Sequence, residues 1–141
     1  MFNAIKSEKD IENFLDKTNS LHDGFIIGVQ YINDGISVKG DVYDFNSEQT
    51  KLILRILVTS IFDTIIEIEF EDLLEWQIRD NQRDITDTAL AFVEQHIIWT
   101  DDSCIHMNEL KNGSNELKNG SNELKNGSYV IARSMKWRIV E

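Results

Sequence analysis

The sequence lacks the features by which several protein classes are recognised. It has one cysteine, Cys104, and no proline among its 141 residues. A single cysteine excludes an internal disulfide framework and indicates a reducing compartment. No segment approaches the roughly 18 apolar residues that a membrane helix needs, and the first residues meet charge at once, unlike a signal peptide. We therefore expect a cytoplasmic protein.

Catalytic motifs are scarce as well. The chain has no glycine-rich phosphate loop, no GxSxG and no HExxH. His96, Cys104 and His106 fall within eleven residues, but a fourth zinc ligand and a CxxC pair are missing. A Cys104 nucleophile with His106 as its base would need an oxyanion hole, which nothing in the sequence marks. The sequence predicts no catalytic residue, no metal site and no cofactor.

Negative charge is what the sequence has in excess. It contains 25 Asp and Glu against 14 Lys and Arg, a formal charge of -11. Such a field repels nucleic acid and anionic membranes and speeds association with basic partners, although it also serves solubility alone. We expect a basic protein partner and no nucleic-acid or membrane partner. The sequence leaves the oligomeric state open.

Two neighbouring strands are expected at the centre of a single domain over residues 1–141. Residues 51–59 are apolar almost throughout, which predicts a strand covered on both faces. Residues 66–71 alternate apolar and acidic side chains, the period of a strand with one buried and one wet face. The resulting acidic stripe is interpreted either as a solvated face or as a docking surface for a basic partner. Its candidate partner-binding residues are Glu67, Glu69, Glu71 and Asp72.

The N-terminal part predicts one helix and a hairpin. Ser7 with Asp10 resembles a capping box, and the apolar residues that follow at helical spacing predict an amphipathic helix over residues 8–19. Residues 25–32 form a strand, and Asn33-Asp34-Gly35 is a hairpin turn signal. The returning strand covers residues 36–45, where Gly40 indicates a bulge or a close approach of another backbone.

The C-terminal part predicts further strands. Residues 73–78 prolong the central strand past an irregularity, and residues 86–100 favour two strands with a turn near Gln95 over one helix. The last strand, 129–140, places Ile131, Met135, Trp137 and Ile139 on one face, with Arg133 at its edge. Lys136 or Arg138 would pair with carboxylates across the sheet. The predicted fold is α+β: one N-terminal helix packed on a mostly antiparallel sheet or partly rolled barrel of about six strands.

A tandem repeat interrupts the last predicted hairpin. Asn-Glu-Leu-Lys-Asn-Gly-Ser occurs three times without change over residues 108–128, from Asn108 through Gly113, Gly120 and Gly127 to Ser128. Identity at every position indicates duplication at the DNA level, natural or engineered, because structural constraint preserves residue classes rather than every residue. We interpret the repeat as an insertion in a loop, where doubling the length costs only about 0.6 kcal/mol. Short helical pieces and extra meander strands are the alternatives.

His22 and Asp23 are the one histidine and carboxylate adjacent in sequence. Because Gly24 follows, we interpret His22, Asp23 and Gly24 as a structural turn. The alternative is a small metal-dependent hydrolase that uses His22 and Asp23.

The helix, LHDGFI, the Asp-Gly hairpin and the closing MKWRIV strand resemble small bacterial domains. Those domains share a His-Asp turn at the start of an antiparallel sheet and a basic, aromatic last strand. Some are similar to immunity proteins that neutralise secreted toxins of neighbouring bacteria. The resemblance covers residues 8–45 and 129–139 and implies a non-enzymatic protein that binds a protein partner.

Overall fold

The computed structural model describes residues 1–79, 84–101 and 127–140. Within them the chain forms one α-helix, α1 (Glu8–Lys17), and short 3₁₀ turns at Asn19–Leu21, Ser47–Gln49 and Thr59–Ile61. The strands are β1 (Asn3–Ala4), β2 (Gly24–Asn33), β3 (Ile36–Lys39), β4 (Val42–Phe45), β5 (Thr50–Val58), β6 (Thr64–Gln77), β7 (Ala89–Val93), β8 (His96–Thr100) and β9 (Tyr129–Val140). The predicted α+β class is confirmed.

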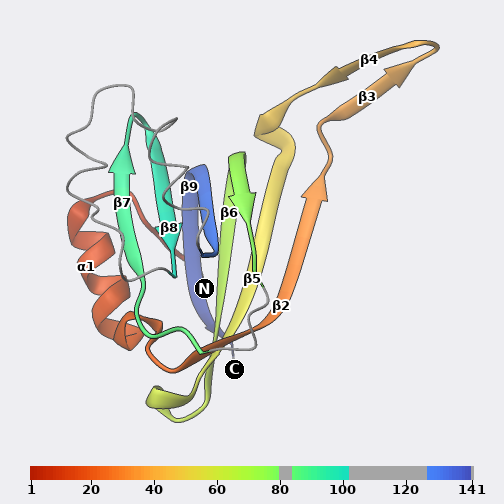
Figure 1. The fold of residues 1–141 in the computed structure, drawn as a ribbon. Helices are drawn as coiled ribbons and strands as arrows, with labels where there is room; N and C mark the ends of the chain where they lie inside the picture. Colours follow the sequence, from red (N-terminus) through yellow and green to blue (C-terminus); the bar gives the residue numbers. More distant parts are fainter. Residues whose placement is uncertain (80–83, 102–126, 141) are drawn as a thin grey trace.

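Seven strands form one antiparallel sheet in the order β2-β5-β6-β9-β8-β7, with β1 paired to β9. Figure 1 shows this sheet open, with β2 and β7 at its two sides. The rolled-barrel alternative is therefore wrong. The chain does curve back at one end, since a single bridge joins Gly24 to Ile85, just ahead of β7.

The helix begins and packs as its sequence predicts. Ser7 Oγ accepts from the Asp10 backbone N–H at 3.2 Å, and Asp10 Oδ2 accepts from the Lys6 N–H at 2.9 Å. The first bond satisfies a donor that a helix leaves free at its N-terminus, and the second ties the residue ahead of the N-cap to the first turn. Phe14 is fully buried, and its ring meets Trp137 of β9 edge-on at 5.3 Å. The helix ends at Lys17, two residues before the predicted end.

β5 and β6 are neighbours as predicted, but the middle pair of the sheet is β6 and β9, and β5 lies next to the edge strand β2. β5 is also covered on one face only. Its residues Leu52, Leu54, Ile56 and Val58 are fully buried and face the core. On the other face Arg55 is exposed and Ile53 and Leu57 are half-buried. The prediction of two covered faces was wrong because an apolar run looks the same whether its second face is covered by another layer or by long side chains of neighbouring strands.

The predicted hairpin between residues 25–32 and 36–45 is wrong. β2 pairs with β5, while residues 36–45 form two short strands, β3 and β4, which pair with each other in a separate two-stranded sheet. Figure 1 shows this β3–β4 arm extending beyond the ends of β2 and β5. Gly40 lies at the tip with a φ of 62° and no atom within 4 Å of an added Cβ. It is a turn residue, not a bulge or a close approach.

The strands after β6 follow the prediction closely. β7 and β8 are the two strands favoured for residues 86–100, and Glu94 and Gln95 turn between them with φ values of 50° and 69°. β6 continues to Gln77 past a register shift between Leu73 and Glu75.

The predicted faces of β9 hold only for its second half. Met135 and Trp137 face the main core, but Val130 and Ala132 join them there. Ile131 instead lies in a second cluster with Tyr129, Ala91, Val93 and Ile98. The alternation slips near Arg133, beside the irregular part of β6, and a period of two cannot be carried across such a slip.

Candidate binding surface

The acidic stripe of β6 is paired with cations from both neighbouring strands. The register sets Glu67 beside Arg55 of β5 and Arg138 of β9. Arg138 Nε donates to Glu67 Oε2 at 2.6 Å, and Arg55 Nε lies 3.4 Å from Glu67 Oε1. Glu67 is only 7% exposed as a result.

Glu69, two residues further along β6, also lies between cations from both neighbouring strands. Its carboxylate lies 2.7 Å from Lys51 Nζ and 3.8 Å from Lys136 Nζ, and it too is 7% exposed. The bond to Glu69 raises the pKa of Lys51 above its usual value of 10.5. Long cationic side chains with apolar stems thus cover both glutamates from solvent. Phe2 adds to the cover, since Lys136 Nζ and Arg138 Cζ lie 4.9 and 4.5 Å from its ring centre.

The two outer members of the stripe are also paired but more open. Lys136 Nζ lies 3.2 Å from Glu71 Oε1, whose side chain is 41% exposed. Arg133 Nε lies 3.4 Å from Asp72 Oδ2, and Asp72 also accepts from Ser47 Oγ at 2.7 Å.

The expectation that this stripe is a solvated acidic wall is therefore wrong. Four carboxylates meet five cations, Lys51, Arg55, Arg133, Lys136 and Arg138, which gives the set a formal charge of +1. The rest of the chain carries the charge of -12 that brings the total to -11. The prediction that Lys136 and Arg138 pair with carboxylates across the sheet is confirmed. The cations of β5 were missed, although the order of strands would have placed them opposite the glutamates.

His22, Asp23 and Gly24 lie in the turn before β2. The His22 Nδ1 is 2.6 Å from the Thr86 carbonyl oxygen, and its Nε2 is 3.6 Å from Asp23 Oδ1. The hydrogen bond to Thr86, and then the charge of Asp23, raise the pKa of His22 above 6.5. The Asp23 N–H donates to Ile85 O, and a Cβ at Gly24 would lie 2.6 Å from Leu21 O. The turn thus joins β2 to the segment before β7.

The metal-dependent hydrolase alternative needs further ligands beside His22 and Asp23. Among the residues that the structure describes, no group of three or more His, Cys, Asp or Glu side chains is arranged to hold a metal ion. His96 lies at the start of β8, with its Nδ1 3.1 Å from the Glu94 carbonyl oxygen. Cys104 and His106 lie outside the described residues.

The repeat lies between β8 and β9, the hairpin for which the sequence predicted it. Asn108, Gly113 and Gly120 lie outside the described residues, but the last two residues of the third copy are within them. Gly127 O accepts from Gln77 Nε2 at 2.9 Å. Ser128 is fully buried, and its backbone exchanges hydrogen bonds with Asp101: its N–H donates to Oδ1 at 2.8 Å and its carbonyl accepts from the Asp101 N–H at 3.2 Å.

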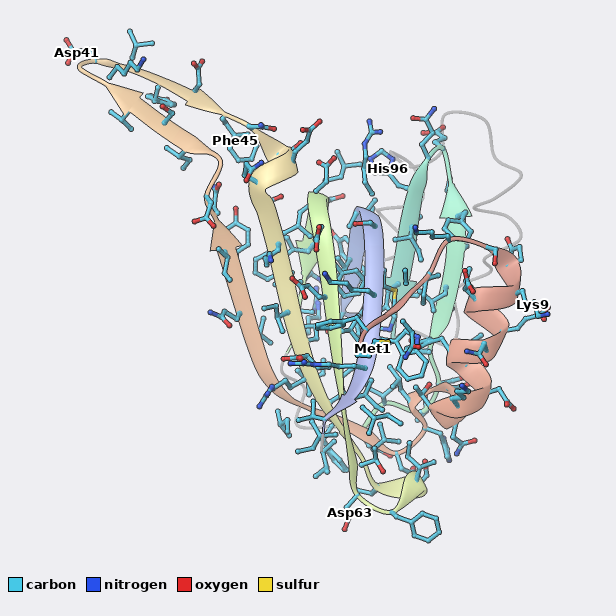
Figure 2. All side chains as sticks on the ribbon, turned by 180° about the vertical axis from the view of Figure 1, so that it is seen from behind. Met1, Lys9, Asp41, Phe45, Asp63 and His96 are labelled. Carbon is cyan, nitrogen blue, oxygen red and sulfur yellow. The ribbon has the colours of Figure 1, made fainter. Side chains whose placement is uncertain are left out.

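Among the residues that the structure describes, the β3–β4 arm is the largest group of exposed apolar side chains outside the main sheet. All eight of its strand residues are exposed, and five of them are large and apolar: Ile36, Val38, Val42, Tyr43 and Phe45. Figure 2 shows Asp41 at the tip of the arm, at the opposite end of the molecule from Asp63. The sequence predicts one continuous strand over residues 36–45, and that pattern does not reveal this surface.

Comparison with known proteins adds no assignment: no family model, no curated protein and no solved structure matches the chain significantly. In the part of the chain described by the structure, no helix combines the length and apolar character needed to cross a membrane.

Proposed function

We propose that this protein is a non-enzymatic binding protein that holds a basic protein partner. The observation that carries the proposal is the position of the negative charge. The ion pairs around β6 neutralise the stripe from which the partner surface was first predicted, so the surplus of -12 lies on other parts of the chain. Uncompensated charge of one sign attracts a partner of the other sign and speeds its association.

Two groups of carboxylates, at opposite ends of the molecule, contribute part of this surplus. Residues 34–48 contain four carboxylates and one lysine. At the other end Asp23, Asp84 and Asp87 all act electrostatically on His22. Grouped carboxylates of this kind give the surface around them a negative electrostatic potential. The glutamates of β6 do not, because the paired cations cancel their charge.

The resemblance to immunity proteins suggests which basic partner to test first. A secreted toxin with a basic active surface fits an acidic inhibitor, because complementary charge gives fast capture and rejects like-charged proteins. Such a role needs a shaped surface and no reactive group on the inhibitor.

The proposal is tested by retention of a partner on the immobilised protein at two salt concentrations. At about 0.01 M salt the screening length is about 30 Å, and at about 0.15 M it is about 8 Å. We expect a basic protein to be retained at low salt and weakened as salt rises. The control is an unrelated acidic protein of equal net charge, which should not retain the same partner. Absence of a specific partner under both conditions would refute the proposal.

A further inference from the structure

We infer that the β3–β4 arm is the docking surface for the partner, and that its occupant is an apolar segment flanked by Lys or Arg on a basic protein. The inference rests on the proposed function and names the surface that performs it.

The arm is amphipathic, with an uncovered apolar face. In an antiparallel pair, directly opposite residues share a face, and residues two apart along a strand share it too. Ile36 pairs with Phe45 and Val38 with Tyr43, so these four side chains lie together on one face. Ser37 with Asp44 and Lys39 with Val42 occupy the other face. The apolar face thus carries two aromatic side chains, each directly opposite a β-branched one.

An isolated two-stranded sheet is marginally stable in water, because it buries little apolar surface of its own. The arm has no strand of the main sheet beside it, and Tyr43 is 74% exposed. A partner that covers the apolar face would remove this surface from water and add stability to the arm. Tyrosine and phenylalanine are suited to that role, because a large ring buries much area at a small cost in conformational entropy.

The root of the arm, where the chain enters and leaves it at residues 33–35 and 46–49, is held by hydrogen bonds. Asn46 N donates to Gly35 O at 2.9 Å, and Asp34 N donates to Gln49 O at 3.1 Å. Asn33 Oδ1 accepts from Gly35 N at 3.0 Å, and Ser47 joins the root to Asp72 of β6. These bonds hold the direction in which the arm leaves the sheet, so a partner does not have to order it from a free chain.

Charge decides the kind of occupant. The arm and its root, residues 34–48, carry Asp34, Asp41, Asp44 and Glu48 against Lys39 alone. A net charge of -3 around an apolar face favours a partner segment with an apolar centre and cationic flanks. A second copy of this chain is disfavoured, because it would bring a total of -11 against -11 and an equally acidic arm.

The test uses a synthetic peptide with a valine-rich centre and lysines at both ends, with a counterpart that carries glutamate in place of lysine. Binding to the full chain is measured by titration calorimetry at low salt. The informative variant is Tyr43→Ser. Its matched control is Val42→Ser, which removes an apolar side chain of 68% exposure from the opposite face of the same arm. Asp41→Asn with Asp44→Asn tests the charge.

We expect the lysine peptide to bind the wild type and Val42→Ser equally and Tyr43→Ser about tenfold more weakly. The Asp-to-Asn pair should weaken binding at low salt, and the glutamate peptide should not bind. Equal binding to Tyr43→Ser, or no binding of the lysine peptide, would overturn the inference. So would a dimer in light scattering that Tyr43→Ser abolishes, since a second copy would then cover the face. If the Tyr43→Ser protein still retains the basic partner of the salt experiment at wild-type strength, the inference fails and the proposed function stands.

Discussion

Glu67 and Arg138 are 71 positions apart in the sequence, yet Arg138 Nε donates to Glu67 Oε2 at 2.6 Å across the β6–β9 pair. Arg55 approaches the same carboxylate from β5. A glutamate in the middle of a three-strand surface is thereby held by two arginines and covered by their stems. The acidic stripe of β6 thus connects the strands β5, β6 and β9 by ion pairs.

Replacing Glu67 with Gln should therefore destabilise the protein more than the same change at Glu71. The Glu67 side chain is only 10% exposed, and removal of its charge weakens the charge-assisted hydrogen bonds to Arg55 and Arg138, which costs roughly 1.5–3 kcal/mol of unfolding free energy. Glu71 is 41% exposed and should cost less than about 1 kcal/mol. Chemical denaturation of both variants measures the difference. Equal effects would mean that burial of Glu67 contributes nothing to stability.

Replacing Gly35 with Ala should disrupt the root of the β3–β4 arm while leaving the main sheet folded. A Cβ at this position would collide with the carbonyl oxygen of Asn46, and a backbone atom held in a turn cannot move aside without loss of the root hydrogen bonds. Gly28→Ala is the matched control, because its added Cβ meets Arg55 at an ordinary 3.5 Å. Amide chemical shifts of residues 36–45 should change in the first variant only. Unchanged shifts in both would show that the root tolerates a side chain.

His22 should make the protein less stable as the pH rises above 6.5. The Thr86 carbonyl, and then Asp23, raise its folded-state pKa above that of the unfolded chain. The folded state then binds the proton more tightly, so this stabilisation is fully present below 6.5 and is lost as the pH passes the folded-state pKa. Melting temperatures between about pH 6 and 8 should fall in the wild type and fall less in His22→Gln.

The same variant separates the turn from a metal-dependent hydrolase. A glutamine can still donate to the Thr86 carbonyl, so a purely structural residue would lose the pH dependence and keep the fold. Loss of bound metal or of turnover at unchanged stability would instead favour the enzyme.

Tyr129 should contribute stability that disappears at strongly alkaline pH. Burial, then the charge of Glu75 and a hydrogen bond to it, raise the pKa of Tyr129 from 10.0 to about 12. The neutral phenol is favoured in the folded state, so the contribution is present below pH 10 and is lost as the pH rises from 10 to about 12. Thermal unfolding across that range should show a steeper decline in the wild type than in Tyr129→Phe. Tyr43→Phe, at an exposed position of the arm, should decline as the wild type does.

Many elements of this fold can be predicted from the sequence because their local patterns agree with the tertiary packing. The cap at Ser7, the alternation of residues 66–71 and the turn near Gln95 all specify elements that the structure contains. The arm was mispredicted because Asn33-Asp34-Gly35 carries the same turn chemistry whether the chain reverses there or only bends into a second hairpin. Which of the two occurs depends on β5 pairing with β2, a contact between strands that no local pattern encodes.

The solvation of the acidic stripe was mispredicted for a related reason. The alternation of β6 shows that its glutamates share a face, but solvation of that face depends on which side chains lie on the adjacent strands. Lys51 and Arg55 stand in the sequence as interruptions of an apolar run, and only the β5–β6 register turns them into partners of Glu69 and Glu67.

The closure of the β8–β9 connection has a consequence for how this chain can change over generations. Asp101 and Ser128 close it by two hydrogen bonds, one between their main-chain groups and one from the Ser128 N–H to the Asp101 carboxylate. Ser128 is the final residue of a unit that ends in Asn-Gly-Ser in every copy. Loss or gain of one whole unit by slippage during replication would leave the same three residues directly ahead of Tyr129. Alleles with different copy numbers would therefore keep the same hydrogen bonds between Asp101 and the last serine of the repeat. The gene can vary in length at this point without changing the residues that hold β8 and β9 together.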